Sequence, residues 1–223
     1  MKTLAPDGRI LTIEHNTEPL LGPWAFQLWI YGQRGAYRLH TGAAGSTELV
    51  EKQTGRHGRL TVREASLAGR RIVSYEDGPG GGTTFLWVGR HHEVSTFVAG
   101  VGVPPEAFID MLRPLAIDDS PDGVVVRPQK GSGARADNLL AANSVADLCG
   151  LTVTPVENVR SQLPTHAGRS VRGGWLWREE AAAVPSHRSV LLANETTATS
   201  IVSDRADDAR MASFVESVRL ELR

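Results

Sequence analysis

The sequence predicts an α+β protein made of two related units, each a mostly antiparallel sheet covered by helices. Three observations lead to this fold. Alternating apolar and polar residues, typical of strands, fill much of the first half, and WAFQLWIY (residues 24–31) is the clearest case. Amphipathic helical patterns are few. A strand–strand–helix pattern occurs twice at a nearly constant spacing, which indicates either an internal duplication or the convergence of two ordinary strand–strand–helix endings.

Strands are expected wherever short apolar or β-branched runs are bounded by glycine, proline or polar turn residues. The expected strands are residues 9–14, 24–31, 36–40, 59–64 and 71–77, followed by a hairpin of residues 85–88 and 94–98 around the turn GRHHE.

Three helices are expected, at residues 104–115, 136–150 and 207–222. The first has proline in its opening turn, where the missing N–H costs nothing. The second carries spaced leucines and ends near Gly150. The third begins with two acidic residues, which favour a helix N-terminus, and places Phe214, Val215 and Val218 on one stripe.

The repeat is visible as two aligned endings. FLWV (residues 85–88) matches VLLA at 190–193, and STFV (95–98) matches SIVS at 200–203, each 105 residues later. The acidic, turn-rich stretch IDDSPDG (117–123) lies between the halves and has the composition of a boundary. We therefore expect one unit over residues 1–122 and a second over 123–223, packed as one globular body.

These strand–strand–helix endings resemble the ends of PsbP/Mog1-like domains and of LolA/RseB-like lipoprotein-carrier half-barrels. Both families have antiparallel sheets covered by helices. The resemblance covers roughly the last third of each half, so it implies the sheet-plus-helix fold and not a particular activity.

Composition narrows the functional classes. The chain has 223 residues, a formal net charge of −1 and a single cysteine, Cys149. The charge balance argues against a nucleic-acid partner, and one cysteine allows no internal disulfide. Because no apolar run has the length of a membrane helix or a leader, we expect a cytoplasmic protein. Only three of 24 basic residues are lysine, a bias that indicates a GC-rich bacterial genome.

The motifs that could carry chemistry have simpler structural explanations. His91 and His92 are neighbours in GRHHE, and adjacent strand residues point to opposite faces, so a hairpin tip is favoured over a metal site. The GSGARA stretch (131–136) fits a dinucleotide motif but follows its strand too late for the tight turn. Cys149 is expected to be a small buried side chain. The sequence therefore predicts no metal and no cofactor.

Aromatic residues on the expected strands are the best binding candidates, and in the second half these strands include GWLWREE (residues 174–180), which resembles RIVSYED (71–77) in position and pattern. Trp24 and Trp29 are five residues apart, so they face opposite sides of their strand. Either one side is a core and the other a groove, a domain junction or a partner surface, or the sheet is covered on both faces within this chain. Tryptophan and tyrosine are also enriched where proteins bind partners. The residues expected to bind a ligand or partner are Trp29, Tyr31, Trp87, Trp175 and Trp177.

These features favour a non-catalytic binding protein, whose ligand is a protein partner or a small hydrophobic molecule. No catalytic residue is identified, because no acid–base pair, nucleophile or phosphate-binding loop stands out. The alternative is a cofactor-free enzyme, such as an isomerase, cyclase or hydrolase, that works in an apolar β-lined pocket. A homo-oligomer is a third option.

Overall fold

The computed structural model shows a protein dominated by strands. It describes all 223 residues except 16–17, 34, 46–60, 77–80, 180–187 and 204–207. Strands account for 59% of the structure and helices for 13%. The antiparallel pairing is confirmed, but the α+β class with sheets covered by helices is wrong: the protein is mostly β. No helix in the described part of the chain is both long enough and apolar enough to span a membrane.

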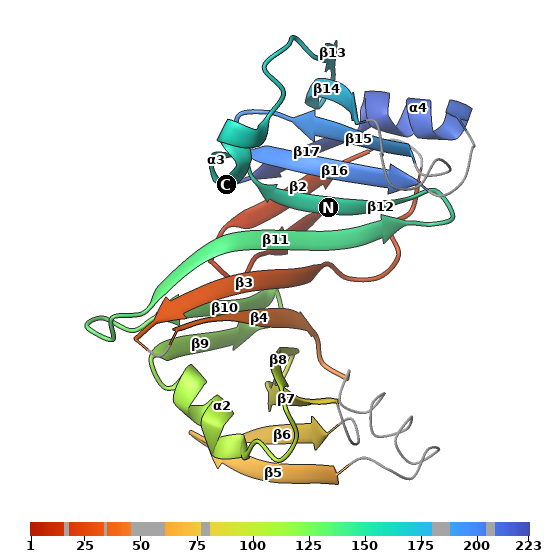
Figure 1. Cartoon of the computed structure of the whole chain (residues 1–223). Coiled ribbons are helices and arrows are strands. Elements are labelled where there is room, and N and C mark those ends of the chain that lie inside the picture. The colour runs from red at the N-terminus through yellow and green to blue at the C-terminus, as the bar shows by residue number, and fades with distance from the viewer. Residues whose placement is uncertain (16–17, 34, 46–60, 77–80, 180–187, 204–207) are drawn as a thin grey trace. The chain divides into compact units, whose positions relative to one another are not determined.

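The described residues form seventeen strands and a few short helices (Figure 1). The strands of the first half are β1 (Lys2–Leu4), β2 (Ile10–Glu14), β3 (Ala25–Gly32), β4 (Gly35–Ala43), β5 (Thr61–Leu67), β6 (Arg70–Glu76), β7 (Gly82–Val88) and β8 (His92–Ala99). The later strands are β9 (Leu115–Ser120), β10 (Gly123–Pro128), β11 (Arg135–Val145), β12 (Cys149–Pro155), β13 (Arg169–Val171), β14 (Gly174–Glu179), β15 (Arg188–Ala193), β16 (Thr197–Ser203) and β17 (Arg219–Leu222). The helices are α2 (Pro105–Leu112), α3 (Val156–Val159), the 3₁₀ turn η1 (Arg160–Gln162) and α4 (Asp208–Ser217).

The chain divides into two compact units. Unit 1 comprises Met1–Ala5, Arg9–Ala25 and Asn138–Arg223, and unit 2 comprises Pro6–Gly8 and Phe26–Asp137. The boundary expected after residue 122 falls in the turn between β9 and β10.

Unit 2 contains six antiparallel strands in the order β3-β4-β8-β7-β6-β5, together with the β9–β10 hairpin and α2. Helix α2 lies against β5 and β6 (Figure 1). Its Phe108 stacks on Phe85 of β7, with ring centroids 5.4 Å apart, and both rings are buried. Since strand side chains alternate between faces, Phe85 marks the sheet face that forms the core with α2.

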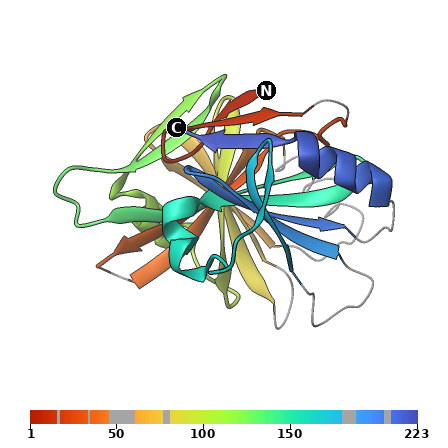
Figure 2. The same cartoon turned by 90° about the horizontal axis from the view of Figure 1, so that it is seen from above.

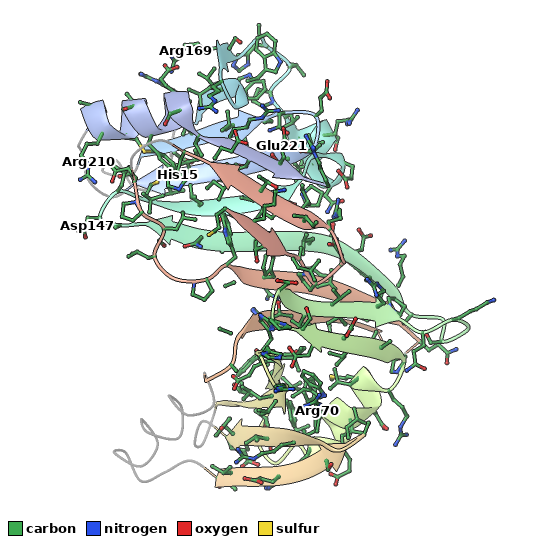
Figure 3. The ribbon with its side chains drawn as sticks, turned by 180° about the vertical axis from the view of Figure 1, so that it is seen from behind. His15, Arg70, Asp147, Arg169, Arg210 and Glu221 are labelled. Atoms are coloured by element: carbon green, nitrogen blue, oxygen red, sulfur yellow. The ribbon has the colours of Figure 1, made fainter. Side chains whose placement is uncertain are left out.

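Unit 1 contains six antiparallel strands in the order β11-β12-β16-β15-β14-β13 and a small sheet in the order β1-β2-β17. Helix α4 leads directly into β17, the last strand (Figure 2). Phe214 of α4 is buried and lies 6.3 Å from the ring of His15, which is seen beneath the helix in Figure 3. After α4, the backbone at Val218 lies close to Gly173. A Cβ on Gly173 would stand 2.4 Å from the Val218 carbonyl oxygen, so this position has no room for a side chain.

The connectivity of the six strands is the same in both units. The six strands are numbered in chain order within each set, from β3 in unit 2 and from β11 in unit 1. Both sets then follow the order 1-2-6-5-4-3, and a helix comes after the sixth strand. β7 and β15, which carry the matched residues 85–88 and 190–193, are the fifth strands of their units. The spacing observed in the sequence therefore corresponds to one arrangement of strands that is present twice.

The helix expected at residues 136–150 is a second correction. This segment forms β11, a turn, and the start of β12. Leu139, Ala141 and Val145 are buried at even spacings along β11, as a strand requires. The apolar residues Leu140 and Ala142 lie between them on the other face, and they obscure this alternation in the sequence.

The other two expected helices exist but are shorter. α2 ends at Leu112 and the chain enters β9 at Leu115. α4 ends at Ser217, and Arg219–Leu222 forms a strand paired with β2. Part of the apolar sequence assigned to helices therefore belongs to strands, namely β11, the start of β12, the first residue of β9, and β17, which lowers the helix content. Of the expected strands, residues 59, 60 and 77 lie outside the described part.

Candidate functional site

Trp175 and Trp177 line one pocket in unit 1. Both lie on β14, and the pocket also contains Val156, Leu163 and Ala193 in its walls, with a volume of about 480 Å³. Residues i and i+2 of a strand share a face, which explains why the two indoles meet here. Trp175 is 51% exposed, a large value for so apolar a side chain.

The walls of this pocket are held by specific contacts. The indole N–H of Trp177 donates to the His166 carbonyl at 2.9 Å. Gly168 lies so close that a Cβ there would stand 2.8 Å from the Trp177 ring. Trp177 is therefore fixed in place, whereas Trp175 presents half of its surface to water.

Asn194, at the β15–β16 turn, is a structural residue of the same pocket. Its amide donates to the carbonyl oxygens of Gly173 and Leu220, at 3.1 and 2.7 Å. Its oxygen accepts the backbone N–H groups of Thr196 and Thr197, at 2.9 and 3.0 Å. Both ends of the amide are thus engaged within the fold, which leaves Arg160 and Glu195 as the charged groups of the pocket.

Trp29 and Tyr31 form a second aromatic feature, on β3 of unit 2. Their rings stack with centroids 6.3 Å apart and an interplanar angle of 27°. The guanidinium carbon of Arg38 lies 5.3 Å from the Trp29 ring centroid, and that of Arg135 lies 5.2 Å from the Tyr31 ring. We call these four side chains the arginine–aromatic ladder.

Trp87 is in a different setting, because it is only 4% exposed. Its ring lies 5.9 Å from the Arg70 guanidinium and borders a cavity of about 440 Å³ that also contains Leu112, Leu115 and Asp119. The structure therefore places Trp87 in the core of unit 2, with one edge on this cavity. The five aromatic candidates occupy three settings: the ladder, the core and the Trp175–Trp177 pocket.

The GRHHE turn is organised by a residue from another strand. Asp119 of β9 accepts the backbone N–H groups of Arg90 and His91 through Oδ2, at 2.5 and 2.9 Å. Its Oδ1 lies 3.0 Å from Nδ1 of His92. Gly89 has no room for a side chain, since a Cβ would stand 2.6 Å from that same Oδ2. The turn is the tip of the β7–β8 hairpin, and the contacts of Asp119 hold it against β9; we call it the tied turn.

The electrostatics of Asp119 follow from these contacts. The carboxylate is buried, with 2% of its side chain exposed. Burial by itself would raise its pKa, but the hydrogen bonds from His91, His92 and Arg90 outweigh burial and hold the pKa below its usual value. The ionised carboxylate is therefore the stable form at this position.

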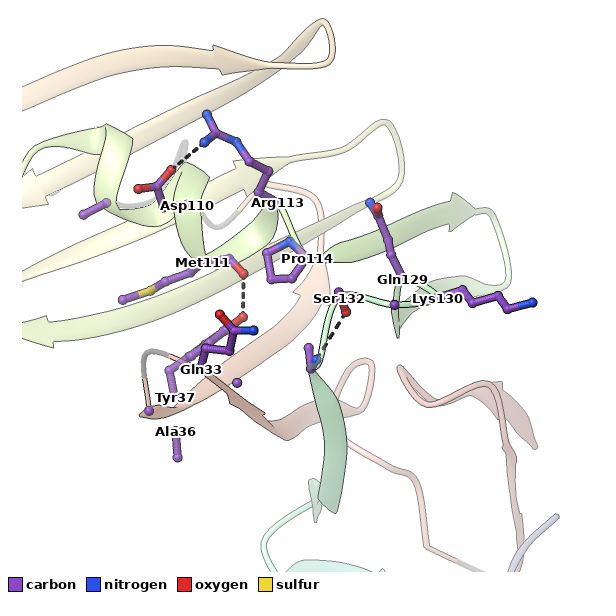
Figure 4. Close-up of a pocket in the computed structure, with 15 residues that line it drawn as sticks. Gln33, Ala36, Tyr37, Asp110, Met111, Arg113, Pro114, Gln129, Lys130 and Ser132 are labelled. Atoms are coloured by element: carbon purple, nitrogen blue, oxygen red, sulfur yellow. Dashed lines mark hydrogen bonds and ion pairs between the residues drawn. The ribbon is translucent and has the colours of Figure 1, made fainter.

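A further cavity of about 660 Å³ lies in unit 2, between the end of α2, the β3–β4 turn and the β10–β11 loop (Figure 4). The hydroxyl of Tyr37 donates to the Met111 carbonyl, and burial raises the pKa of Tyr37 to about 12. Asp110 is ion-paired with Arg113 at 3.0 Å. The tyrosine stays protonated near neutral pH and the carboxylate is paired, so neither is poised for proton transfer.

The thiol of Cys149 is also unsuited to nucleophilic chemistry. Burial, with a contribution from Glu18, raises the pKa of the Cys149 thiol to about 12, so the nucleophilic thiolate is scarce near neutral pH. Within the described ranges, no three His, Cys, Asp or Glu side chains are grouped so that they could hold a metal ion.

Three residues that contact the candidate residues were not predicted from the sequence, namely Arg38, Arg135 and Asp119. Arg38 lies directly opposite Trp29 in the β3–β4 pair, a register that follows from the tight Gly32–Gly35 turn. That turn could have predicted the contact. Arg135 and Asp119 reach their partners through the tertiary fold, and IDDSPDG shows only the composition of a turn, so no local signal marked either residue.

Comparison with known proteins gives no match, either among protein-family models or among curated proteins and solved structures.

Proposed function

We propose that this chain is a non-catalytic binding protein, and that the Trp175–Trp177 pocket receives an apolar side chain from a protein partner. The exposure of Trp175 carries this proposal. A tryptophan that is 51% exposed on a paired strand leaves a large apolar area in water. Covering such an area is favourable, and tryptophan is prominent among residues that dominate binding energies.

The rigidity of the pocket supports the same function. β14 is paired on both sides, with β13 and with β15, so the backbone that carries both indoles is fixed. Trp177 is also anchored by its hydrogen bond to His166. A pre-formed surface loses little conformational entropy when a partner binds, which favours affinity.

The chemistry of the walls favours an apolar group over a polar substrate. Val156, Leu163 and Ala193 supply aliphatic surface, and the Asn194 amide is engaged within the fold. Arg160 and Glu195 are exposed charged groups of the pocket. An apolar centre with charged residues around it is the usual anatomy of a protein–protein contact.

A site-specific crosslinking experiment tests this proposal. A photoreactive benzophenone amino acid is introduced at position 175, and at Val202 as the matched control, since Val202 is an exposed apolar residue of the same unit outside the pocket. We expect a discrete protein adduct from position 175 and none from position 202.

The captured protein is then purified and titrated calorimetrically against the variants. Trp175→Ala should weaken binding at least about tenfold, while Val202→Ala should change it less than about twofold. Equal effects of the two substitutions would contradict the proposal, as would adducts formed equally from both positions.

A further inference from the structure

The arginine–aromatic ladder of unit 2 offers a second surface, with a different chemistry. Trp29 and Tyr31 stack on one face of β3, and a guanidinium group lies over each ring. On the opposite face of β3, Leu28 and Ile30 are buried. The strand is thus held firmly from behind, and the ladder has a fixed position.

The aromatic rings of the ladder position the two arginines but do not occupy the N–H groups of their guanidinium groups. A guanidinium that lies over an aromatic ring is attracted by the ring face, while its N–H groups stay free to point outward in the guanidinium plane. Among the described residues, the Arg38 side chain donates one hydrogen bond, to the Gln27 amide oxygen at 3.1 Å. A guanidinium has five N–H donors, so most of those of Arg38 remain available to a ligand.

The positive charge of the ladder is incompletely neutralised. Within the part of the chain that the structure describes, no carboxylate pairs with Arg38, which is exposed. Arg135 has Asp137 at 3.6 Å, longer than a normal hydrogen bond, and both side chains are exposed. Two pre-positioned cations beside apolar rings form a surface complementary to acidic side chains, whose methylene groups can cover the rings.

We propose that the ladder docks an extended, acidic segment of a protein partner. The spacing suits such a segment: the rings are 6.3 Å apart, and alternate residues of an extended chain are about 6.6 Å apart. Acidic residues two apart in the segment point to the same side, so their carboxylates would pair with Arg38 and Arg135 while their methylene groups lie against the rings. This surface lies outside the Trp175–Trp177 pocket and does not depend on it.

An acidic protein segment suits the chain better than single-stranded nucleic acid does, although stacked aromatics and arginines bind both. Nucleic-acid binders usually carry an overall basic charge, and this chain has a net charge of −1. The acidic segment is therefore the occupant that the charge balance favours.

Calorimetric titration with a designed peptide tests the inference. The probe is acetyl-Glu-Leu-Glu-Leu-Glu-amide, compared with the same peptide carrying lysine in place of glutamate. Arg38→Gln and Arg135→Gln remove one cation each. Arg71→Gln is the matched control, since Arg71 is an exposed arginine of the same unit that pairs with Glu64. Thermal melts establish that each variant is folded.

We expect saturable binding of the acidic peptide, no binding of the lysine peptide, and an affinity that falls as salt is raised. Arg38→Gln and Arg135→Gln should each weaken binding by about tenfold, and Arg71→Gln by less than about twofold. No saturable binding, or equal losses in all three variants, would overturn the inference. Tighter binding of an oligothymidylate with the same dependence on Arg38 would overturn the assignment to a protein partner.

Discussion

Nδ1 of His92 lies 3.0 Å from Oδ1 of Asp119, and the other oxygen of that carboxylate accepts the backbone N–H groups of Arg90 and His91. One buried side chain from β9 therefore holds the tip of the β7–β8 hairpin. The adjacent histidines of GRHHE belong to a tied turn, and His92 contributes to its stability.

Asp119→Asn should destabilise the protein. The substitution removes the negative charge. It also places an NH₂ donor among the groups of Arg90, His91 and His92 that donate hydrogen bonds to Asp119. Hydrogen bonds to charged groups contribute about 1.5–3 kcal/mol each, and part of this remains with the amide oxygen, so we expect a loss of about 1–3 kcal/mol. Urea denaturation measures it. Asp118→Asn, at the exposed neighbouring position, should change stability by less than about 0.5 kcal/mol, and equal losses would contradict the tied-turn interpretation.

The stability of the wild type and that of Asp119→Asn should depend differently on pH. Because the pKa of Asp119 is lower in the folded than in the unfolded protein, its ionised form stabilises the fold above the unfolded pKa of about 4. This contribution is lost as the pH falls through the folded pKa. The stability difference between wild type and Asp119→Asn should therefore be constant near neutral pH and shrink below about pH 4. Denaturation midpoints over this range measure it, and a constant difference throughout would exclude the mechanism.

Truncation of Trp87 should destabilise the protein much more than truncation of Trp175. Trp87→Ala removes a buried ring from the core and should cost about 3–5 kcal/mol. Trp175→Ala removes a half-exposed ring and should cost about 1 kcal/mol or less. Thermal and urea unfolding compare the two. A large loss for Trp175→Ala would mean that this indole stabilises the fold, and it would weaken the proposal that the pocket is a binding surface.

Phe214 should be essential to the packing of α4. It is 1% exposed, so Phe214→Ala should cost about 3–5 kcal/mol. Glu216 forms an exposed ion pair with Arg169, and such pairs contribute about 1 kcal/mol or less, so Glu216→Ala serves as the control on the same helix. Calorimetric melting of the two variants tests this prediction. Equal melting temperatures for Phe214→Ala and wild type would mean that α4 is not docked.

The charge on Arg38 should be detectable at His40. Burial lowers the pKa of His40, and the nearby Arg38 lowers it further. Arg38→Gln should therefore raise the His40 pKa part of the way toward its usual value of about 6.5, since burial remains. Titration of the imidazole signals by NMR measures the shift. An unchanged His40 pKa would show that the guanidinium does not occupy the position over Trp29 described here.

The sequence predicted elements whose pattern is local. Alternation in residues 24–31 identified β3, and the apolar stripe containing Phe214 identified α4, because each pattern reports one buried face. The repeated spacing of 105 residues also reflected a real regularity in strand order.

The helix predicted at 136–150 was wrong because β11 carries apolar residues on both faces. Leu140 and Ala142 alternate with the buried Leu139, Ala141 and Val145, and the resulting run is compatible with either period. Misassigning this one segment, together with the strand that ends the chain, changed the predicted class from mostly β to α+β.

The candidate sites were predictable only in part. Trp175 and Trp177 were identified as two tryptophans on one expected strand. Their exposure, the stacking of Arg135 on Tyr31 and the burial of Trp87 depend on residues distant in sequence. Such contacts arise from tertiary packing, which no local pattern reports.

The central claim is that the Trp175–Trp177 pocket accepts an apolar side chain, and NMR of the indole N–H groups tests it most directly. The protein is titrated with the N-acetyl amides of leucine, phenylalanine and serine, and Trp175→Ala assigns the Trp175 signal. We predict that the leucine and phenylalanine amides shift the Trp175 signal saturably, whereas the serine amide does not. The absence of a shift with either apolar amide, or an equal shift with serine, would contradict the claim.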